Sequence, residues 1–201
     1  MGAYIMEQRE AVRLETESLI LRSFADSDTK AMFGIFGDRE TNRFLPWFPV
    51  KTMEETLLFC RRYFGNEGTH LYSYVICPKE NDIPIGYISV GAADSYDMGY
   101  GLCRECRHKG FASEAGRAVI ARLKQEGIPY VTATHDVNNP HSGNVMKRLG
   151  MTYRYSYEEQ WQPKDIRVTF RMYQLNFNED DRTVYTGYGE SSGHCFIEQG
   201  I

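Results

Sequence analysis

Four side chains that can carry positive charge, Arg104, Arg107, His108 and Lys109, crowd the predicted start of a helix. Cations are normally disfavoured at this end of a helix by about 0.3–1 kcal/mol each, because the helix dipole is positive there. The backbone N–H groups of a first helical turn also lack partners within the helix. A polyphosphate ligand would satisfy both features, and Gly110 would let it approach the backbone closely.

A solvated basic turn is the alternative interpretation, in which Glu105 and Glu114 absorb part of the charge. The sequence contains neither the G-x-x-x-x-G-K-[ST] motif of nucleoside triphosphate loops nor the G-x-G-x-x-G motif of dinucleotide sites. A phosphate site at this turn would therefore follow a different pattern.

The basic turn needs a strand before it and a helix after it, and the sequence predicts both. Residues 98–103 form a short β-rich run, and from Ala112 the apolar residues follow a helical period that stops at Gly127 and Pro129. This alternation of strands and helices predicts a mixed α+β domain. The other predicted strands are 18–24, 71–77, 83–92, 130–135, 153–162 and 168–175, and the other predicted helices are 26–36, 52–65 and 140–149.

Length and composition favour one compact domain, because 201 residues of which 42% are hydrophobic can bury a stable core. An odd number of cysteines, five, and the lack of an N-terminal signal pattern predict a reduced, cytoplasmic protein. No run approaches the roughly 20 apolar residues that cross a bilayer, so no membrane partner is expected. The net charge of −4 argues against nucleic acid as a partner.

The last part of the chain, residues 176–201, differs from the rest in charge. It holds five acids and one base, whereas the acids and bases of residues 1–175 balance. This acidic extension also contains Tyr185, Tyr188 and Phe196, which would let it pack on the domain.

Cys103 and Cys106 form a lone C-x-x-C pair. Zinc requires four ligands, and neither a second C-x-x-C nor a nearby H-x₃-H accompanies the pair. A thioredoxin-like redox site would place its cysteines at the start of a helix in a different pattern. A metal or redox protein is therefore the less favoured interpretation.

Several motifs resemble the GNAT acetyltransferase superfamily, in its RimJ/RimL-like branch. The similarity covers roughly residues 12–175, in the expected order and spacing. The matching residues are Arg107-x-x-Gly110-x-Ala112 after a strand, like the Q/R-x-x-G-x-G/A signature that cradles the coenzyme A pyrophosphate; Asn139-x-x-Ser142-x-x-Val145-x-x-x-Leu149-Gly150-Met151; residues 14–22; and Pro84-Ile85-Gly86-Tyr87-Ile88.

The resemblance implies a GNAT fold for residues 1–175, with residues 176–201 as an acidic extension. This fold has a central, mostly antiparallel twisted sheet whose fourth and fifth strands splay apart, flanked by about four helices. The implied reaction is direct transfer of an acetyl group from acetyl-CoA, the cosubstrate, to a primary amine in a ternary complex without a metal. The partner would be a protein N-terminal α-amine or a small-molecule amine, and a homodimer is compatible with this function.

The cofactor residues follow from the matching positions. In this family the pantetheine amides pair with the exposed edge of the fourth strand, much as an added strand would. The implied cofactor residues are Gly101, Leu102 and Cys103 on that edge, Arg107, His108, Lys109, Gly110, Phe111 and Ala112 at the pyrophosphate, and Asn139 and Ser142 near the thioester.

Acetyl transfer needs a neutral amine and a proton for the departing thiolate. Many GNAT enzymes supply that proton from a tyrosine, but the matching residue here is Met146, which cannot donate one. In RimL-like enzymes a serine takes this role, and Ser142 matches it, although Ser142 could instead cap the short helix. The matching base is Glu159 or its neighbour Glu158, and a solvated strand face is the alternative for both.

The aromatic loop from Phe44 to Pro49 is the candidate acceptor wall, because the first two helices cover the substrate side in this fold. Phe44, Trp47 and Phe48 are the candidate binding residues, and they could equally belong to the core. A coenzyme A-binding module without catalysis is the rival hypothesis, motivated by Met146 at the usual tyrosine position.

Overall fold

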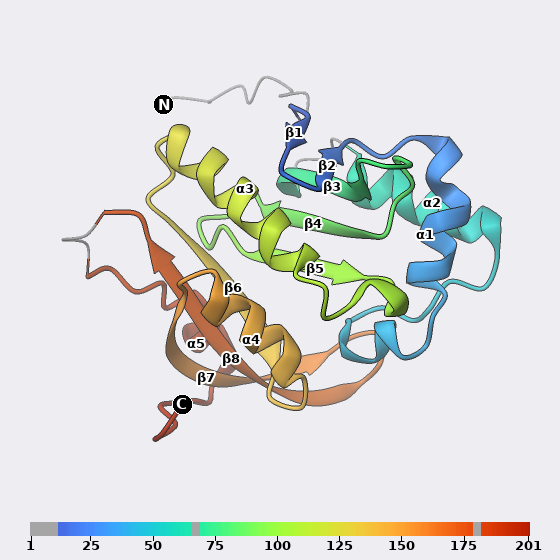
Figure 1. The fold of residues 1–201 in the computed structure, drawn as a ribbon. Helices are drawn as coiled ribbons and strands as arrows, with labels where there is room; N and C mark the ends of the chain where they lie inside the picture. The colour runs from blue at the N-terminus through green and yellow to red at the C-terminus, as the bar shows by residue number, and fades with distance from the viewer. Residues whose placement is uncertain (1–11, 66–68, 179–181) are drawn as a thin grey trace, which may run out of the picture.

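The computed structural model describes residues 12–65, 69–178 and 182–201. Its first sheet has five strands in the order β1-β2-β3-β4-β5, and every neighbouring pair is antiparallel (Figure 1). The five strands are β1 (Leu14–Glu15), β2 (Leu19–Arg22), β3 (His70–Pro78), β4 (Gly86–Gly91) and β5 (Met98–Leu102).

The second sheet has four antiparallel strands in the order β6-β8-β7-β9. Strands β5 and β6 are parallel and meet in one isolated bridge, between Asp97 and Thr132, after which they separate. These are the predicted fourth and fifth strands, so the splayed GNAT arrangement is confirmed. The strands of this sheet are β6 (Tyr130–Asp136), β7 (Thr152–Trp161), β8 (Ile166–Asn176) and β9 (Cys195–Phe196).

Helices cover both faces of the two sheets. Helices α3 (Phe111–Gln125) and α4 (Pro140–Arg148) lie side by side on one face, which we call the α3/α4 face (Figure 1). Helices α1 (Thr29–Phe36) and α2 (Met53–Phe64) cover the opposite face of the first sheet, the α1/α2 face. On the same side of the molecule, α5 (Gly187–Ser192) packs against β7 of the second sheet.

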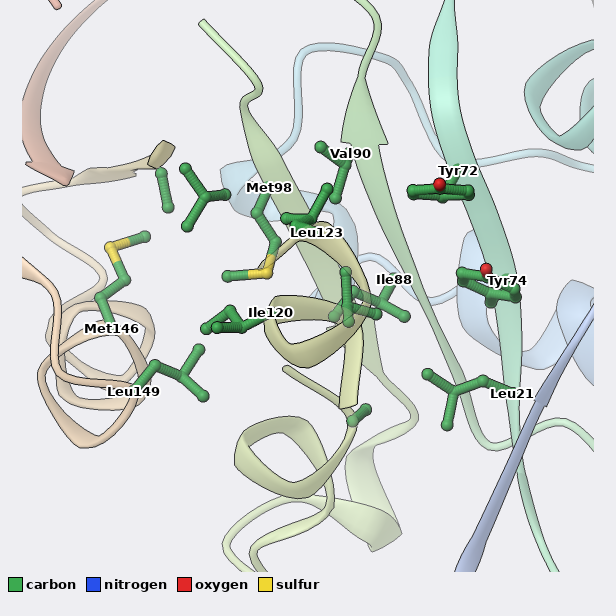
Figure 2. Close-up of a cluster of buried hydrophobic side chains, with 14 of the residues drawn as sticks. Leu21, Tyr72, Tyr74, Ile88, Val90, Met98, Ile120, Leu123, Met146 and Leu149 are labelled. Atoms are coloured by element: carbon green, nitrogen blue, oxygen red, sulfur yellow. The ribbon is translucent and has the colours of Figure 1, made fainter. Parts of the chain in front are cut away.

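The largest hydrophobic cluster joins the two sheets beneath α3. Figure 2 shows Ile120 and Leu123 of α3 between strand residues such as Ile88 on one side and Met146 and Leu149 of α4 on the other. This one cluster includes residues from both sheets. Its close packing therefore fixes the position of β5 relative to β6. A second cluster beneath α1 and α2 centres on Phe36, which lies against Tyr87 of β4.

Local chemistry explains the helix ends that position the site. Helix α2 begins after Thr52, whose side chain accepts a hydrogen bond from the backbone N–H of Glu55 at 3.1 Å, as the sequence predicts. Asp28 precedes α1 without a capping bond and instead pairs with Arg22 at 2.7 Å. The predicted strand 83–92 is shorter in the structure and starts at Gly86, because Pro84 cannot donate to the sheet.

The extension after β8 contains one more short helix and one more short strand than the sequence analysis predicted. Both α5 and β9 lie within residues 182–201. Three of the five acids of the extension, Glu179, Asp180 and Asp181, lie outside the described residues. Across the described parts of the chain, no helix combines the length and the apolar composition that crossing a bilayer requires.

Candidate active site

A cavity of about 350 Å³ lies where β5 and β6 separate. It extends from the turn after β5, past the start of α4, to the loop between α1 and α2. Its lining includes nine of the eleven predicted cofactor residues, all but Cys103 and Lys109. The lining residues that the argument uses are Thr41, Phe44, Tyr87, Tyr100, Gly101, Leu102, Arg107, His108, Gly110, Phe111, Ala112, Asn139 and Ser142.

The turn before α3 has the geometry of an anion site. Gly110 is the N-cap of α3 with φ 88°, a conformation that side chains other than glycine rarely adopt, and His108 also has a positive φ of 62°. A Cβ added to Gly110 would meet no atom within 4 Å, so glycine is required by its conformation and not by crowding. The first-turn N–H groups, from Phe111 onward, therefore face open space beside basic side chains.

Arg107 is held by the loop between α1 and α2. Its guanidinium donates to the Thr41 hydroxyl at 2.6 Å and lies 3.4 Å from the carboxylate of Glu40, which also pairs with Arg104 at 3.1 Å. Glu114, which sequence analysis offered as a partner for the basic turn, instead accepts bonds from Thr16 and Ser18. The charge of the turn is therefore balanced in part by Glu40, a residue that local sequence could not indicate.

The end of β5 contributes Tyr100, Gly101 and Leu102 to the lining of the cavity. Gly101 faces Tyr87 across the strand pair, and a Cβ on Gly101 would lie 2.6 Å from the tyrosine ring. The Tyr87 ring therefore occupies the space that a side chain at position 101 would need. Cys103 follows the edge, but its N–H donates to the Ile85 carbonyl at 2.8 Å, so it cannot also pair with a ligand.

The start of α4 brings a tyrosine and a serine together. The Tyr100 hydroxyl donates to the Ser142 carbonyl at 2.8 Å and lies 3.1 Å from the Ser142 hydroxyl. Burial raises the pKa of Tyr100, so the phenol stays protonated. Asn139, not Ser142, is the N-cap of α4, which corrects the capping alternative for Ser142. Sequence analysis missed Tyr100, although its position in the predicted strand could have indicated it.

Met146, at the usual tyrosine position, is 1% exposed and belongs to the main hydrophobic cluster. Its side chain therefore packs in the core and does not face the cavity. A different tyrosine, Tyr100 of β5, reaches the α4 backbone with its hydroxyl.

Asp97, just before β5, lies on the α1/α2 face together with Gly99 and Gly101 of that strand, because residues two apart share a face of a strand. The Asp97 Oδ1 atom is shielded from solvent and finds no hydrogen-bond partner among the described residues. Burial raises the pKa of Asp97 to about 6, a hydrogen bond from Tyr188 opposes this rise, and the charge of Glu159 adds to it. Sequence analysis did not single out Asp97.

The two predicted base candidates face opposite sides of β7. Glu159 is opposite Val168, and Tyr157 is opposite Phe170, on the face that packs beneath α5. Glu159 is exposed to solvent, and partial desolvation beside these neighbours raises its pKa. Glu158 points to the other face and pairs with Arg167 at 2.8 Å. Neither glutamate lines the cavity, but only Glu159 is coupled electrostatically to Asp97.

The aromatic loop divides between the cavity and the core. Phe44 lines the cavity, whereas Trp47 packs against Phe59 with ring centroids 5.3 Å apart and donates from its indole N–H to Asn42 at 3.1 Å. Phe48 is 58% exposed and does not line the cavity. The structure therefore brings one of the three predicted acceptor residues to the cavity.

The two thiols of the C-x-x-C pair lie beside the cavity rather than in it. Burial and contact with Cys106 raise the pKa of Cys103 to about 12, which leaves its thiol protonated. Within the described residues, no group of three or more His, Cys, Asp or Glu side chains could hold a metal ion.

Comparison with known proteins gives a consistent result. Residues 18–152 match the family model for the acetyltransferase (GNAT) domain. The chain is 26% identical over 144 residues to YnaD, an uncharacterised N-acetyltransferase of Bacillus subtilis. The aligned region covers 70% of this chain and 82% of YnaD.

Solved structures share the fold. A GNAT acetyltransferase from Bacillus anthracis matches with a TM-score of 0.72 and 22% identity, over 82% of this chain and 98% of that one. A Salmonella typhimurium acetyltransferase that modifies the N-terminal serine of ribosomal protein L7/L12 matches with a TM-score of 0.69 and 18% identity, over 81% and 97%. The family match covers well over half of the sequence, and the chain therefore belongs to the GNAT acetyltransferase family and is an acetyltransferase.

Proposed function

We propose that this acetyltransferase moves an acetyl group from acetyl-CoA directly to a primary amine within a ternary complex. The observation that carries the proposal is the shared cavity, because the positive-φ turn at Gly110, Gly101 of β5 and the Tyr100–Ser142 pair all border it. A solved RimL structure with the same fold, with a TM-score of 0.70, is described as a complex with coenzyme A.

The residues present fit coenzyme A in two places. First-turn N–H groups of α3, with Arg107, His108 and Lys109, would hold a pyrophosphate. Gly101 and Leu102, which line the cavity at the end of β5, would contact the pantetheine arm. When bound, acetyl-CoA supplies a thioester whose carbon forms a C–N bond to the amine as the C–S bond breaks.

Ser142 would supply the proton that the departing thiolate needs. Because the Tyr100 phenol donates its proton to the Ser142 carbonyl, its oxygen, 3.1 Å from the Ser142 hydroxyl, would accept from that hydroxyl and orient it. Asn139, at the N-cap of α4, borders the same part of the cavity and would orient the reacting groups.

Glu159, with Asp97, would accept the proton that the amine loses. Elevated pKa values suit carboxylates for this task at neutral pH, since an effective base titrates near the working pH. A base matters most for a lysine-like amine, which is neutral to less than roughly 0.1% at pH 7, and less for an α-amine, which is roughly 10% neutral.

The acceptor is a protein N-terminal α-amine or a small-molecule amine, as in the RimJ/RimL-like branch. The Salmonella relative acts on an N-terminal serine by its description, which supports the first choice. Phe44 would contact the acceptor on one side. We assign the activity to residues 1–175 and treat residues 176–201 as an extension of that domain; the cytoplasmic location and the homodimer stay predictions.

A coenzyme A-binding module without catalysis is the rival, and the buried Met146 favours it. One experiment separates the two. The protein is incubated with acetyl-CoA and a panel of peptide N-termini, polyamines and aminoglycosides, and released thiol is measured while coenzyme A binding is followed by thermal shift. Thiol release with at least one amine supports the transferase, and binding without release on every amine supports the module.

A further inference from the structure

Helices α3 and α4 lie side by side, and both begin at the cavity (Figure 1). At their starts the rings of His108 and His141 meet, with centroids 4.9 Å apart and planes at 73°. Further along, Gly116 of α3 makes room for Leu149, because a Cβ on Gly116 would lie 2.7 Å from the leucine side chain. The starts of the two helices are therefore neighbours on the wall of one cavity.

Neither of these helix starts is capped by a side chain. Gly110, the N-cap of α3, has no side chain, and the side chain of Asn139 makes no capping hydrogen bond at α4. The dipole of each helix is positive at its start, so two uncapped starts attract more negative charge than one. The cavity therefore suits a ligand that carries more than one anionic group.

One face of α4 lines the cavity with hydrogen-bond donors. His141, Asn144, Val145 and Arg148 all border the cavity, and their spacing of three and four residues places them on the same face of the helix. Helical side chains lean toward the start of their helix, which lets Arg148 extend back along this face toward Asn144. The imidazole, amide and guanidinium groups of this face can each donate to phosphate oxygens.

The positive charge on the α4 side is not balanced. On the α3 side Arg107 is paired with Glu40, the only carboxylate among the described residues that line the cavity. Helix α4 contains no acidic residue along its length. Within the parts of the chain that the structure describes, the Arg148 guanidinium has no ion pair or hydrogen bond. Arg148 therefore offers its charge and all of its donors to a ligand.

We propose that His141, Asn144 and Arg148 form a second anion subsite, which binds the 3′-phosphate on the ribose of coenzyme A. The inference rests on the proposed function, in which the first-turn N–H groups of α3 hold the pyrophosphate. Coenzyme A carries this phosphomonoester separately from the pyrophosphate, and a guanidinium with neighbouring N–H donors is suited to it. The subsite makes the protein select complete coenzyme A over a carrier that lacks the 3′-phosphate.

The test compares the binding of coenzyme A and 3′-dephospho-coenzyme A, measured by titration calorimetry at one pH and one ionic strength. The two ligands share the pyrophosphate, the pantetheine arm and the thiol, so the ratio of their dissociation constants isolates the 3′-phosphate. We expect the parent to bind coenzyme A on the order of tenfold more tightly, as hydrogen bonds between charged groups give. Arg148→Gln should bring this ratio close to 1 by weakening the binding of coenzyme A alone.

Lys147→Gln is the matched control, because it removes one positive charge from the same turn of α4 at an exposed residue that does not line the cavity. It should keep the parent ratio, which separates a local contact from general attraction between charges. Arg148→Lys should keep part of the preference, since it retains the charge and loses the planar fork of donors. His141→Ala, one end of the face away, should also lower the ratio.

A parent that binds both ligands equally tightly would overturn the subsite and leave the proposed function standing. An Arg148→Gln variant that loses affinity for both ligands by the same factor would also overturn it, because Arg148 would then contact a group that the two ligands share. If the folded parent binds neither ligand, the proposed function fails at its cofactor. The two failures are therefore distinguishable.

Discussion

The turn from Cys103 to Phe111 and the face around Asp97 serve, in our proposal, the two ends of one reaction, yet they are built differently. The turn is formed within nine consecutive residues, and the groups it offers to a ligand are backbone N–H donors. The positive φ of Gly110 sets the direction of these donors. The face around Asp97 uses side chains from α2, β5, β6, β7 and α5. A site made of backbone depends on conformation, whereas a site made of side chains depends on registers between distant strands.

The largest effect should come from a substitution in the turn from Cys103 to Phe111, and it should be on coenzyme A binding. Gly110→Val places a β-branched residue at φ 88°, so the turn must change conformation and withdraw its N–H donors. We expect coenzyme A to lose its stabilising effect on the melting temperature, an effect that follows from binding to the folded state.

Gly127→Val is the control for strain alone. Gly127 also has a positive φ, 74°, and open space around it, but it follows the far end of α3. The stabilisation by coenzyme A should persist in this variant. If coenzyme A raised the melting temperature of Gly110→Val as much as that of the parent, the phosphates would bind elsewhere.

The next effect tests the acceptor half. Glu159→Gln should lower the rate with a lysine-like amine on the order of 10²–10⁴-fold, and less with an α-amine that is already partly neutral. Glu158→Gln is the matched control, because that carboxylate pairs with Arg167 on the opposite face. Parent-like pH profiles for Glu159→Gln with both amines would show that the amine arrives deprotonated and that the site mainly positions it.

A smaller effect is expected where the two halves meet. Ser142→Ala removes a proton donor that is needed only in the transition state, so kcat should fall on the order of 10²-fold with little change in acetyl-CoA affinity. The Tyr100 bond to the Ser142 carbonyl survives this change. An equal loss of acetyl-CoA affinity, measured by calorimetry, would assign Ser142 to binding.

The last effect is on stability and depends on pH. Burial raises the pKa of Asp97 from 3.8 to about 6, so the folded state holds its proton more tightly than the unfolded state. This group therefore reduces stability progressively as pH rises from about 4 to about 6, by at most about 3 kcal/mol. Asp97→Asn should raise the melting temperature more at pH 8 than at pH 4.

Asp94→Asn, at an exposed neighbouring position, is the control for a change in net charge. Equal increments for Asp97→Asn at both pH values would show that the carboxylate carries no buried charge.

The same contrast explains what could be predicted from the sequence. The turn at Gly110 could be predicted, because a glycine before a helical period is a local signal, and the splayed strands were implied by the resemblance to the GNAT family. The faces of β7 on which Glu158 and Glu159 lie could not be predicted, because they depend on which face of the strand packs beneath α5. Tyr188 gave no signal either, since its partners Thr132 and Tyr157 are distant in the sequence.

Trp47 shows the same limit from the other side. Its place in a proline-rich aromatic loop suggested an exposed wall, but packing against Phe59 and a bond to Asn42 direct it into the core. Aromatic composition alone does not distinguish a binding surface from a buried one.

The loop that holds Arg107 has a consequence for how the two ligands influence each other. Its Thr41 accepts from Arg107, while the Asn42 carbonyl accepts from Lys164 of the β7–β8 connection at 2.6 Å. In the proposed function, a pyrophosphate that binds Arg107 draws it away from Thr41, while Lys164 keeps its bond to the neighbouring Asn42 carbonyl. We therefore expect occupancy of the phosphate site to change the free energy of acceptor binding beside Phe44, and linkage then requires the acceptor to change coenzyme A affinity by the same factor.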